Sequence, residues 1–291
     1  MDLELKHHPV MVDQVISYLD PKNSEIYVDC TFGQGGYSQK ILKDINCKVV
    51  AIDRDSEVKK YATILERKYS NNFTLNIDKF SNIEKILKKN KIEKINGIIF
   101  DLGLSNTQLN NPERGFSFQF NGPLDMRMDK KNIELNAKEV INEYDQKQLS
   151  DIFYYYGNEK NSRKIAKKII EKRKKKEIET TFDLVELIKT INFHKQKHPA
   201  TRVFQALRIF VNDELNELDY TLKKSLSFLK KNSKIITVAF HSLEDSIIKG
   251  FFIKNKSLLK ILTKKPIRPS NKEITLNPRS RSAKMRVAEI L

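Results

Sequence analysis

The sequence of 291 residues predicts an α/β fold, in which a mostly parallel, seven-stranded sheet carries helices on both faces and an all-helical insertion. Three observations predict it. Short apolar runs alternate with helical patterns as far as Asp101, which is typical of successive βαβ units. A long stretch with helical periodicity and no strand pattern follows. The last part of the chain then returns to strands.

The part of the chain before Asp101 contains four predicted strands, each followed by a turn or an acidic residue. These strands cover 26–29, 48–52, 73–77 and 98–101. The helices between them are predicted after residue 36, over 56–68 and over 83–87. Because parallel strands place their carboxyl ends at one edge of a sheet, we expect the residues that follow them to lie close together.

Helical periodicity dominates from about residue 136 to residue 192, and Thr180 is a predicted helix cap. One long helix is predicted to open at 198–201 and to continue past Leu222. A fifth strand follows over 234–240, and His241 is expected to begin another helix. Two final strands, near 258–263 and 285–291, are predicted to pair as a hairpin.

This pattern predicts a core domain that is divided by an insertion. Residues 1–108 form the first part of the core, and residues 201–291 form the second part. Residues 109–200 form a loop and a helical domain, which we expect to recognise the substrate.

The net charge of +17 indicates a polyanionic partner such as a nucleic acid. Lysine greatly outnumbers arginine, so a coding bias is an open alternative, and the basic run at 172–176 is typical of a solvated helix end. No apolar stretch is long enough to span a bilayer, and the acidic start at 1–6 lacks a signal-peptide pattern. Cys30 and Cys47 have no metal-ligand spacing. They favour a reducing compartment, most simply the cytoplasm, and no metal site.

The segment from Asp29 to Ser38 places a glycine-rich turn between a strand and a helix, which is typical of nucleotide sites. Asp53 follows the next strand, where a carboxylate can accept hydrogen bonds from a ribose diol. A dinucleotide site would have a third glycine in place of Ser38, so the pattern favours S-adenosylmethionine, which has no phosphate. A purely structural turn remains the alternative. Phe80 could cover the adenine or belong to the core.

The loop after Asp101 is rich in Gly, Pro and Asn and contains the sequences R-G-F-S-F at 114–118 and G-P-L-D-M-R-M-D at 122–129. Loops of this length are usually functional or disordered, and the phenylalanines argue against disorder. The sequence therefore predicts a ligand-binding loop beside the strand that ends at Asp101.

These segments together resemble the bacterial small-subunit rRNA cytosine-N4 methyltransferase family nearly from end to end. The matching segments are His8 with 9–11, then 29–38, 51–55, 101–129, 156–159, 198–214, 240–245 and 277–289. The resemblance implies a class I S-adenosylmethionine-dependent methyltransferase fold, which is Rossmann-like. It also implies methyl transfer to N4 of a cytidine in the decoding region of 16S rRNA, with the small ribosomal subunit as partner.

The resemblance also implies the cofactor contacts. The matching positions here are Gly35, Gly36, Tyr37, Asp53, Phe80, Asp101 and Gln108. Tyr37 stands where relatives usually have His, and Asn106 with Thr107 replaces the usual Ser-Pro. The first change matters only if the side chain, rather than the backbone, makes the contact.

Asp101 is the first candidate for the reacting centre, with a cofactor contact as its rival role, and Ser105 is a weaker candidate. A group that accepts an N4 hydrogen would help a poor nucleophile, and positioning would supply much of the rest. His198 and His241 each stand at a predicted helix start, where a structural role is favoured over a catalytic one.

Two groups of residues are predicted to contact RNA. Arg114, Phe116, Phe118 and Arg127 would clamp the flipped target base. Arg279, Arg281, Lys284 and Arg286 would contact phosphate. The alternatives are packing for the phenylalanines and a solvated loop for the second group. Arg202, Gln205 and Arg208 share a helix face, and the sequence does not decide between RNA binding and internal ion pairs for them.

Other functions remain open from the residues. One is a methyltransferase for another nucleic-acid amino group, for DNA or for protein. Another is a ribosome-assembly factor without catalysis. An NAD-type oxidoreductase is the weakest option, because the turn has Ser38 and no hydride-transfer acid is evident.

Overall fold

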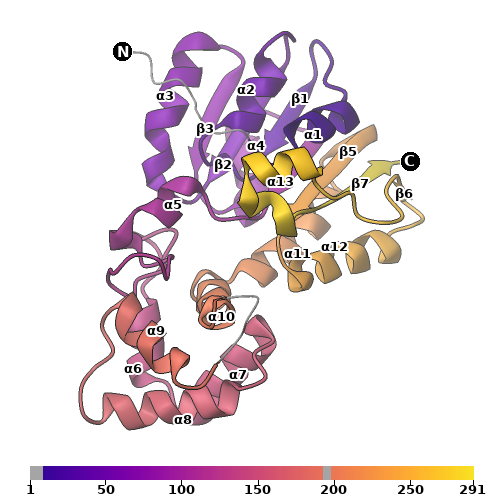
Figure 1. Ribbon diagram of the computed structural model, residues 1–291. Helices are drawn as coiled ribbons and strands as arrows, with labels where there is room; N and C mark the ends of the chain where they lie inside the picture. Colours follow the sequence, from indigo (N-terminus) through magenta and orange to yellow (C-terminus); the bar gives the residue numbers. More distant parts are fainter. Residues whose placement is uncertain (1–8, 193–197) are drawn as a thin grey trace. The chain divides into compact units, whose positions relative to one another are not determined.

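The computed structural model describes residues 9–192 and 198–291 (Figure 1), so His8 lies outside the described residues. The chain forms two compact units, one of 1–103 with 215–291 and one of Leu104–Glu214. The sequence boundaries at 108 and 200 differ from these. The second boundary lies further along because the helix that begins at Thr201 buries Val203, Phe204 and Leu207 in the core of the helical unit.

The first unit contains the predicted seven-stranded, mostly parallel sheet, which is confirmed. Its order is β3-β2-β1-β4-β5-β7-β6. The strands are β1 (Ile26–Asp29), β2 (Lys48–Asp53), β3 (Phe73–Ile77), β4 (Ile95–Asp101), β5 (Leu229–Ala239), β6 (Leu259–Ile261) and β7 (Lys284–Ile290). Strands β1 to β5 are parallel, and β7 pairs antiparallel with both β5 and β6.

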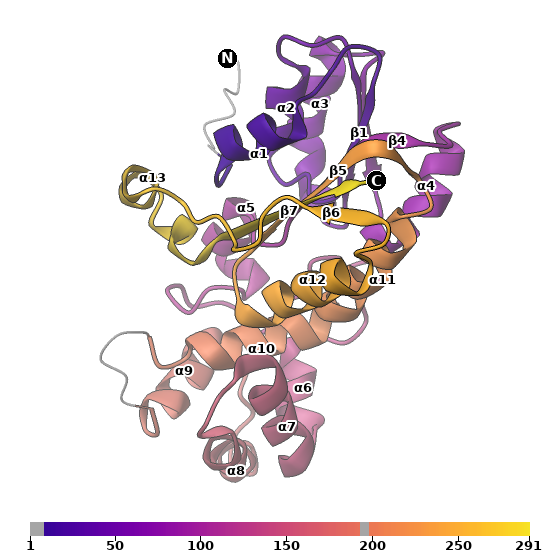
Figure 2. The same ribbon diagram turned by 90° about the vertical axis from the view of Figure 1, so that its right-hand side faces the viewer.

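Helices cover both faces of this sheet (Figure 2), because neighbouring residues of the buried strands point to opposite sides. On β4, Ile99 packs with one layer, and Ile98 and Phe100 pack with the other. The first layer contains α1 (Val12–Leu19), α2 (Gly36–Leu42) and α3 (Lys59–Lys68). The second contains α4 (Ile83–Lys89), α11 (Glu214–Ser225) and α12 (Ser242–Lys254). Short 3-10 turns, Ser56–Val58 and Phe80–Asn82, precede α3 and α4.

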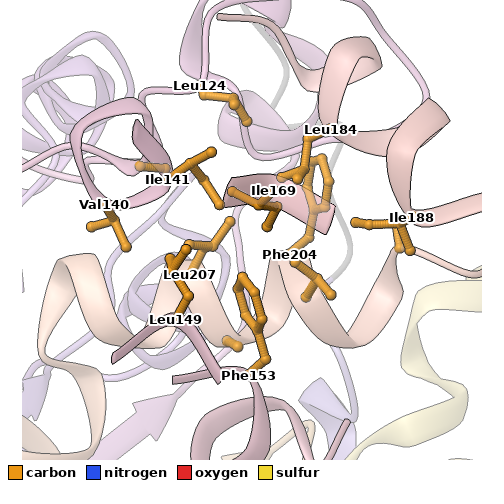
Figure 3. Packing of buried hydrophobic residues seen from close by; sticks show 14 of the residues in the cluster. Leu124, Val140, Ile141, Leu149, Phe153, Ile169, Leu184, Ile188, Phe204 and Leu207 are labelled. Carbon is orange, nitrogen blue, oxygen red and sulfur yellow. The ribbon is translucent and has the colours of Figure 1, made fainter. Parts of the chain in front are cut away.

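The second unit is helical and has its own hydrophobic core (Figure 3). Its elements are α5 (Asn106–Asn110), the 3-10 turn Pro112–Arg114, α6 (Ala137–Glu143), α7 (Gln146–Gly157), α8 (Ser162–Arg173), α9 (Thr181–Lys189) and α10 (Thr201–Asn212). Phe153 of α7, Ile169 of α8, Leu184 of α9 and Leu207 of α10 converge in this core. Thr180 caps α9 as predicted, and it accepts a hydrogen bond from the amide of Asp183.

The predicted single helix after residue 198 is wrong, because the chain breaks it into α10 and α11. Asp213 adopts the left-handed conformation (φ 52°), and its amide bonds back to the carbonyls of Ile209 and Phe210. Arg208 donates two hydrogen bonds, each 2.9 Å long, to the carboxylate of Glu214. The polar Asp213 tolerates this conformation, and the apolar periodicity on both sides conceals the break.

The predicted final pair of strands is confirmed as the antiparallel neighbours β6 and β7. The segment between them contains α13 (Asn271–Leu276) and the 3-10 turn Pro278–Ser282, so it is no tight hairpin. Among the described residues, no helix combines the length and the apolarity that are needed to cross a bilayer.

The close approach of α7 and α10 depends on Gly157. A Cβ atom at this position would lie 2.5 Å from the carbonyl oxygen of Arg202. We expect Gly157→Ala to lower the free energy of unfolding by about 1–3 kcal/mol. Gly250 of α12 is the matched control, because its Cβ would meet no atom within 4 Å. Gly250→Ala should raise stability by about 0.5–1 kcal/mol. Urea unfolding of both variants checks this, and equal effects would contradict the packing argument.

Candidate active site

Three aspartates lie at the carboxyl edge of the parallel strands in the first unit. Asp29 ends β1, Asp53 ends β2 and Asp101 ends β4. The register places Asp29 beside Ala51 on one side and Ile99 on the other. This edge is where parallel α/β sheets bind ligands. The structure thus brings together the two predicted acidic site residues, Asp53 and Asp101, with Asp29 between their strands.

Asp29 is completely buried and belongs to the scaffold of the turn. Its carboxylate accepts hydrogen bonds from the hydroxyl of Ser38 (2.7 Å) and from the amide of Thr31 (3.2 Å). Burial nevertheless raises the pKa of Asp29 to about 6. Ser38, which the sequence marked only as a missing glycine, therefore ties α2 to the end of β1. The one feature of the sequence that could have indicated this bond is the spacing of nine residues between Asp29 and the hydroxyl of Ser38.

Asp53 holds the glycine-rich turn. One carboxylate oxygen accepts from the amide of Gly33 (2.8 Å), and the other accepts from the amide of Asp55 (2.9 Å). Burial raises the pKa of Asp53 to about 6. A carboxylate has about four acceptor positions, so these two bonds leave capacity for a ligand diol.

Gly35 needs a conformation that suits glycine. Its φ is +80°, and a Cβ atom there would lie 2.8 Å from the ring of Phe32. The turn therefore has two neighbouring positions without side chains, Gly35 and Gly36, at the start of α2. This cradle fits a ligand that approaches the chain closely, as predicted for Gly35 and Gly36.

Tyr37, the predicted cofactor contact that departs from its relatives, is buried in the first helix layer. Its phenol donates a hydrogen bond to the carbonyl of Val10. Burial, followed by the charges of Asp101 and Asp29, raises the pKa of Tyr37 well above its ordinary value. The side chain therefore links α2 to the start of the described chain, which leaves the Tyr37 backbone as the group that a cofactor would contact.

Asp101 has an unusual environment. Its amide donates to the hydroxyl of Thr31 (2.7 Å), which fixes the end of β4 against the turn after β1. One carboxylate oxygen, Oδ1, is buried and has no hydrogen-bond partner within 9–192 and 198–291. Burial raises the pKa of Asp101 to about 8, and the charges of Asp29 and Glu244 add to the effect. A buried acceptor without a partner fits a ligand that brings a positive charge or a hydrogen-bond donor.

Phe80 and His241 are the aromatic and histidine candidates of this unit, and each follows a strand of the sheet. Phe80 follows β3, is partly buried, and packs edge-on against Phe100 with the ring centroids 5.9 Å apart. His241 caps α12, where its Nδ1 accepts from the amide of Glu244 at 3.4 Å, as favoured by the sequence. Glu244 in turn accepts from the amide of Phe240 (2.8 Å).

The predicted phosphate-binding group divides into two pairs. Lys284 and Arg286 both contact Asp245, at 3.0 Å and 2.7 Å. Arg279 and Arg281 lie in the 3-10 turn Pro278–Ser282 and are exposed. Phosphate contact stays a prediction for all of them, and the exposed pair is better placed for it.

In the second unit, Ser105 and Gln108 form a capping box at the start of α5. The hydroxyl of Ser105 accepts from the amide of Gln108 (3.2 Å), and the Gln108 side chain accepts from the amide of Ser105 (3.1 Å). Gln108 is buried. The hydroxyl proton of Ser105 remains able to donate, so its predicted catalytic role stays a prediction.

The two loop arginines of the second unit make structural contacts. Arg114 is buried and donates to the carbonyls of Arg127 (3.0 Å) and Met128 (3.1 Å). Arg127 forms a two-bond pair with Asp125 (2.8 and 3.1 Å) and also donates to the carbonyl of Ile133. These bonds hold the loop in shape, and RNA contact by either residue stays a prediction that its placement does not favour.

The phenylalanines of the loop join the same core. Phe116 is buried in the helical core. Phe118 stacks on His198 with the ring centroids 4.3 Å apart and packs edge-on against Phe204. His198 also accepts from the amide of Ala200 (3.3 Å), which agrees with its favoured structural role. Base stacking by Phe116 or Phe118 stays a prediction.

Residues 4–291 match the MraW methylase family. Three similar proteins carry the name "Ribosomal RNA small subunit methyltransferase H". The one from Wolbachia sp. subsp. Drosophila simulans (strain wRi) is 46% identical and covers 99% of this chain and 100% of its own length. The one from Ehrlichia canis (strain Jake) is 44% identical, with 96% and 98% covered. The one from Rickettsia akari (strain Hartford) is 44% identical, with 97% and 98% covered.

The chain therefore belongs to the MraW methylase family, and it is a methyltransferase that depends on S-adenosylmethionine.

Proposed function

We propose that the protein transfers a methyl group to the exocyclic N4 of a cytidine in the decoding region of 16S rRNA. The observation that carries the proposal is the similarity, at 44–46% identity over nearly the whole chain, to proteins named as small-subunit rRNA methyltransferases. The buried acidic edge of the sheet supports the cofactor part of the proposal. The small ribosomal subunit is the partner, and the cytoplasm is the location.

The chain would hold the cofactor with residues from three strand ends. Asp53 would accept hydrogen bonds from the ribose diol, and the backbone of Gly35–Tyr37 would pass close to the ligand. Phe80 would cover the adenine ring. Gln108 is a further proposed contact. The cofactor supplies an electrophilic methyl group on a positively charged sulfur.

Asp101 has two proposed roles. Its partnerless Oδ1 would favour a cationic ligand, or it would accept a hydrogen from the cytidine N4 as that nitrogen attacks. Accepting that hydrogen would return electron density to a nitrogen whose lone pair is delocalised into the ring. Ser105 is the second candidate for contact with N4. The remaining catalysis would come from holding the two reactants in line.

RNA recognition would use residues of both units. Arg279 and Arg281 are exposed and would contact phosphate, with Lys284 beside them. Four side chains of the loop after α5 would hold its shape, and we propose that they also contact the target nucleotide. They are Arg114, Phe116, Phe118 and Arg127.

The alternative substrates are other amino groups of nucleic acids. Because the chain is a methyltransferase of the MraW methylase family, a non-enzymatic assembly factor is no longer an alternative.

Methylation in vitro tests the reaction. The purified protein, incubated with small subunits from a strain without the modification, should produce N4-methylcytidine, which nucleoside mass spectrometry detects after digestion. Methylation of adenosine or of protein alone would contradict the proposed substrate. No methylated product at all, from a protein that binds the cofactor, would also contradict it.

Asp53→Asn tests the ribose contact. We expect the variant to bind S-adenosylmethionine and S-adenosylhomocysteine at least about tenfold more weakly, because both ligands carry the same diol and each lost charged hydrogen bond costs about 1.5–3 kcal/mol. Asp20→Asn is the matched control. Its carboxylate is 72% exposed, and Asn tolerates the left-handed backbone at that position. Calorimetry gives the affinities, and equal behaviour of the two variants would remove Asp53 from the site.

The protonation of Asp101 should make cofactor selectivity depend on pH. Its pKa is raised to about 8, so the carboxyl is mostly neutral at pH 7 before binding. Deprotonation favours the sulfonium ligand over the neutral S-adenosylhomocysteine. The ratio of their affinities should therefore rise roughly tenfold between about pH 6 and pH 9. Asp29 and Asp53, each with a pKa of about 6, are largely ionised by about pH 7, below the midpoint of this change.

Asp101→Asn should make this affinity ratio independent of pH over the same range. The amino-acid groups of the two ligands titrate alike, so they cancel in the ratio. A wild-type ratio that stays flat would contradict a role for Asp101 beside the sulfonium.

A further inference from the structure

Helix α8 carries a basic face on the side opposite to its buried face. Ser162, Ile165, Ala166 and Ile169 pack into the helical core. The four residues between these positions are exposed, and so is Lys172 one turn further on. We name these five the α8 basic face: Arg163, Lys164, Lys167, Lys168 and Lys172. Residues three and four apart lie on the same side of a helix, so these side chains form one continuous surface.

This face has little compensating acidic charge, because Glu171 is the one acidic residue of α8. In the described part of the chain, no carboxylate lies within 4.0 Å of the charged groups of Arg163, Lys164, Lys167 or Lys172, and Lys168 reaches Glu171 only at 3.8 Å. Some exposed lysines elsewhere are paired with a carboxylate. Lys88 pairs with Glu84 at 2.9 Å and Lys189 pairs with Glu186 at 2.9 Å. The charge of the α8 basic face is therefore available to an external anion.

A general bias toward lysine does not account for this concentration of charge. Helices α6, α7 and α9 of the same unit are close to neutral, and α10 has two arginines, no lysine and no acidic residue. Helix α6 has one lysine and two glutamates, α7 has one lysine and one aspartate, and α9 has one lysine and two acidic residues. Helix α8 has six basic residues and one acidic residue in the same or a similar length. A coding bias would have raised the lysine content of all four helices.

The basic face is also held rigidly. Arg173, the sixth basic residue of α8, does not belong to it. Its guanidinium donates to the carbonyls of Ile141 (2.8 Å) and Tyr144 (2.7 Å), which fixes the end of α8 against the end of α6. Burial lowers the pKa of Arg173. A rigid support keeps the basic face in one geometry, which lowers the entropic cost of binding.

We propose that the α8 basic face binds the phosphate backbone of rRNA outside the target nucleotide and so supplies affinity that does not depend on base sequence. The proposal rests on the proposed function, which makes RNA the substrate. The exposed positions of α8 contain no aromatic or apolar side chain that could stack on a base. A surface with positive charge alone matches the phosphate backbone rather than base edges.

The test neutralises four residues together, as Arg163→Gln, Lys164→Gln, Lys167→Gln and Lys172→Gln in the full chain. The matched control replaces four exposed helical lysines of the other unit by Gln, at Lys85, Lys89, Lys249 and Lys254. Both variants lose the same net charge, and Gln is a good helix former. Circular dichroism and cofactor affinity confirm that each variant is folded.

The probe is a labelled RNA duplex of mixed sequence, whose dissociation constant is measured over a range of salt concentrations. The α8 variant should reduce the slope of log affinity against log salt by about 3–4, because each lost phosphate contact removes about 0.9. The control should change the slope by less than one. With small subunits as substrate, the α8 variant should show a KM at least about tenfold higher and a nearly unchanged kcat.

Two results would overturn the proposal. One is an equal loss of slope in both variants, which would mean that only net charge matters. The other is a loss of affinity for polyglutamate in the α8 variant that equals its loss of affinity for the RNA duplex. That result would make the face a general anion-binding surface. If the wild-type protein produced no N4-methylcytidine but lost duplex affinity on α8 neutralisation, the proposed function would fail while the RNA surface stood.

Discussion

The site of the first unit depends on three carboxylates at one edge of a parallel sheet, of which Asp29 is buried and Asp53 and Asp101 are partly buried. Removing such groups from water is costly unless hydrogen bonds replace the lost hydration. Asp29 and Asp53 obtain those bonds from Ser38 and from the backbone of the glycine-rich turn. These hydrogen bonds also fix the shape of the glycine-rich turn. The same aspartates therefore support the turn and line the proposed cofactor site. Asp101 alone keeps a buried oxygen without a partner, and this asymmetry points to where a positively charged ligand belongs.

The helical unit follows a different principle. Its core is built from apolar residues of α6 to α10. The long loop after α5 is held by Arg114 and Arg127, which donate hydrogen bonds to backbone carbonyls. Because a guanidinium offers five donors in a fixed plane, one arginine can satisfy several carbonyls that a loop leaves unpaired. Basic residues in this unit therefore include two contrasting kinds. Arg114, Arg127 and Arg173 donate hydrogen bonds within the unit, whereas the α8 basic face is exposed and has one long ion pair, between Lys168 and Glu171 at 3.8 Å.

The sequence predicted the strands well because their apolar runs are short, sharply bounded and separated by clear helical patterns. The third strand was predicted at 73–77, and β3 covers the same residues. The break at Asp213 was missed because apolar periodicity continues across it. The roles of Thr31 and Ser38 were missed because a hydroxyl that bonds to a buried acid leaves no periodic signal. The placement of Arg114 and Arg127 was missed because charge in a loop indicates a partner, but not whether that partner is RNA or the loop itself.

We propose that Asp53 and Asp101 bind the same cofactor molecule at the carboxyl edge of the sheet, Asp53 at the ribose diol and Asp101 at the sulfonium. The most direct test is a crystal structure with a cofactor analogue that carries an ammonium group in place of the sulfonium. We expect both ribose hydroxyls within hydrogen-bond distance of the Asp53 carboxylate and the ammonium within ion-pair distance of Asp101 Oδ1. A diol bound elsewhere, or an ammonium that points away from Asp101, would contradict it.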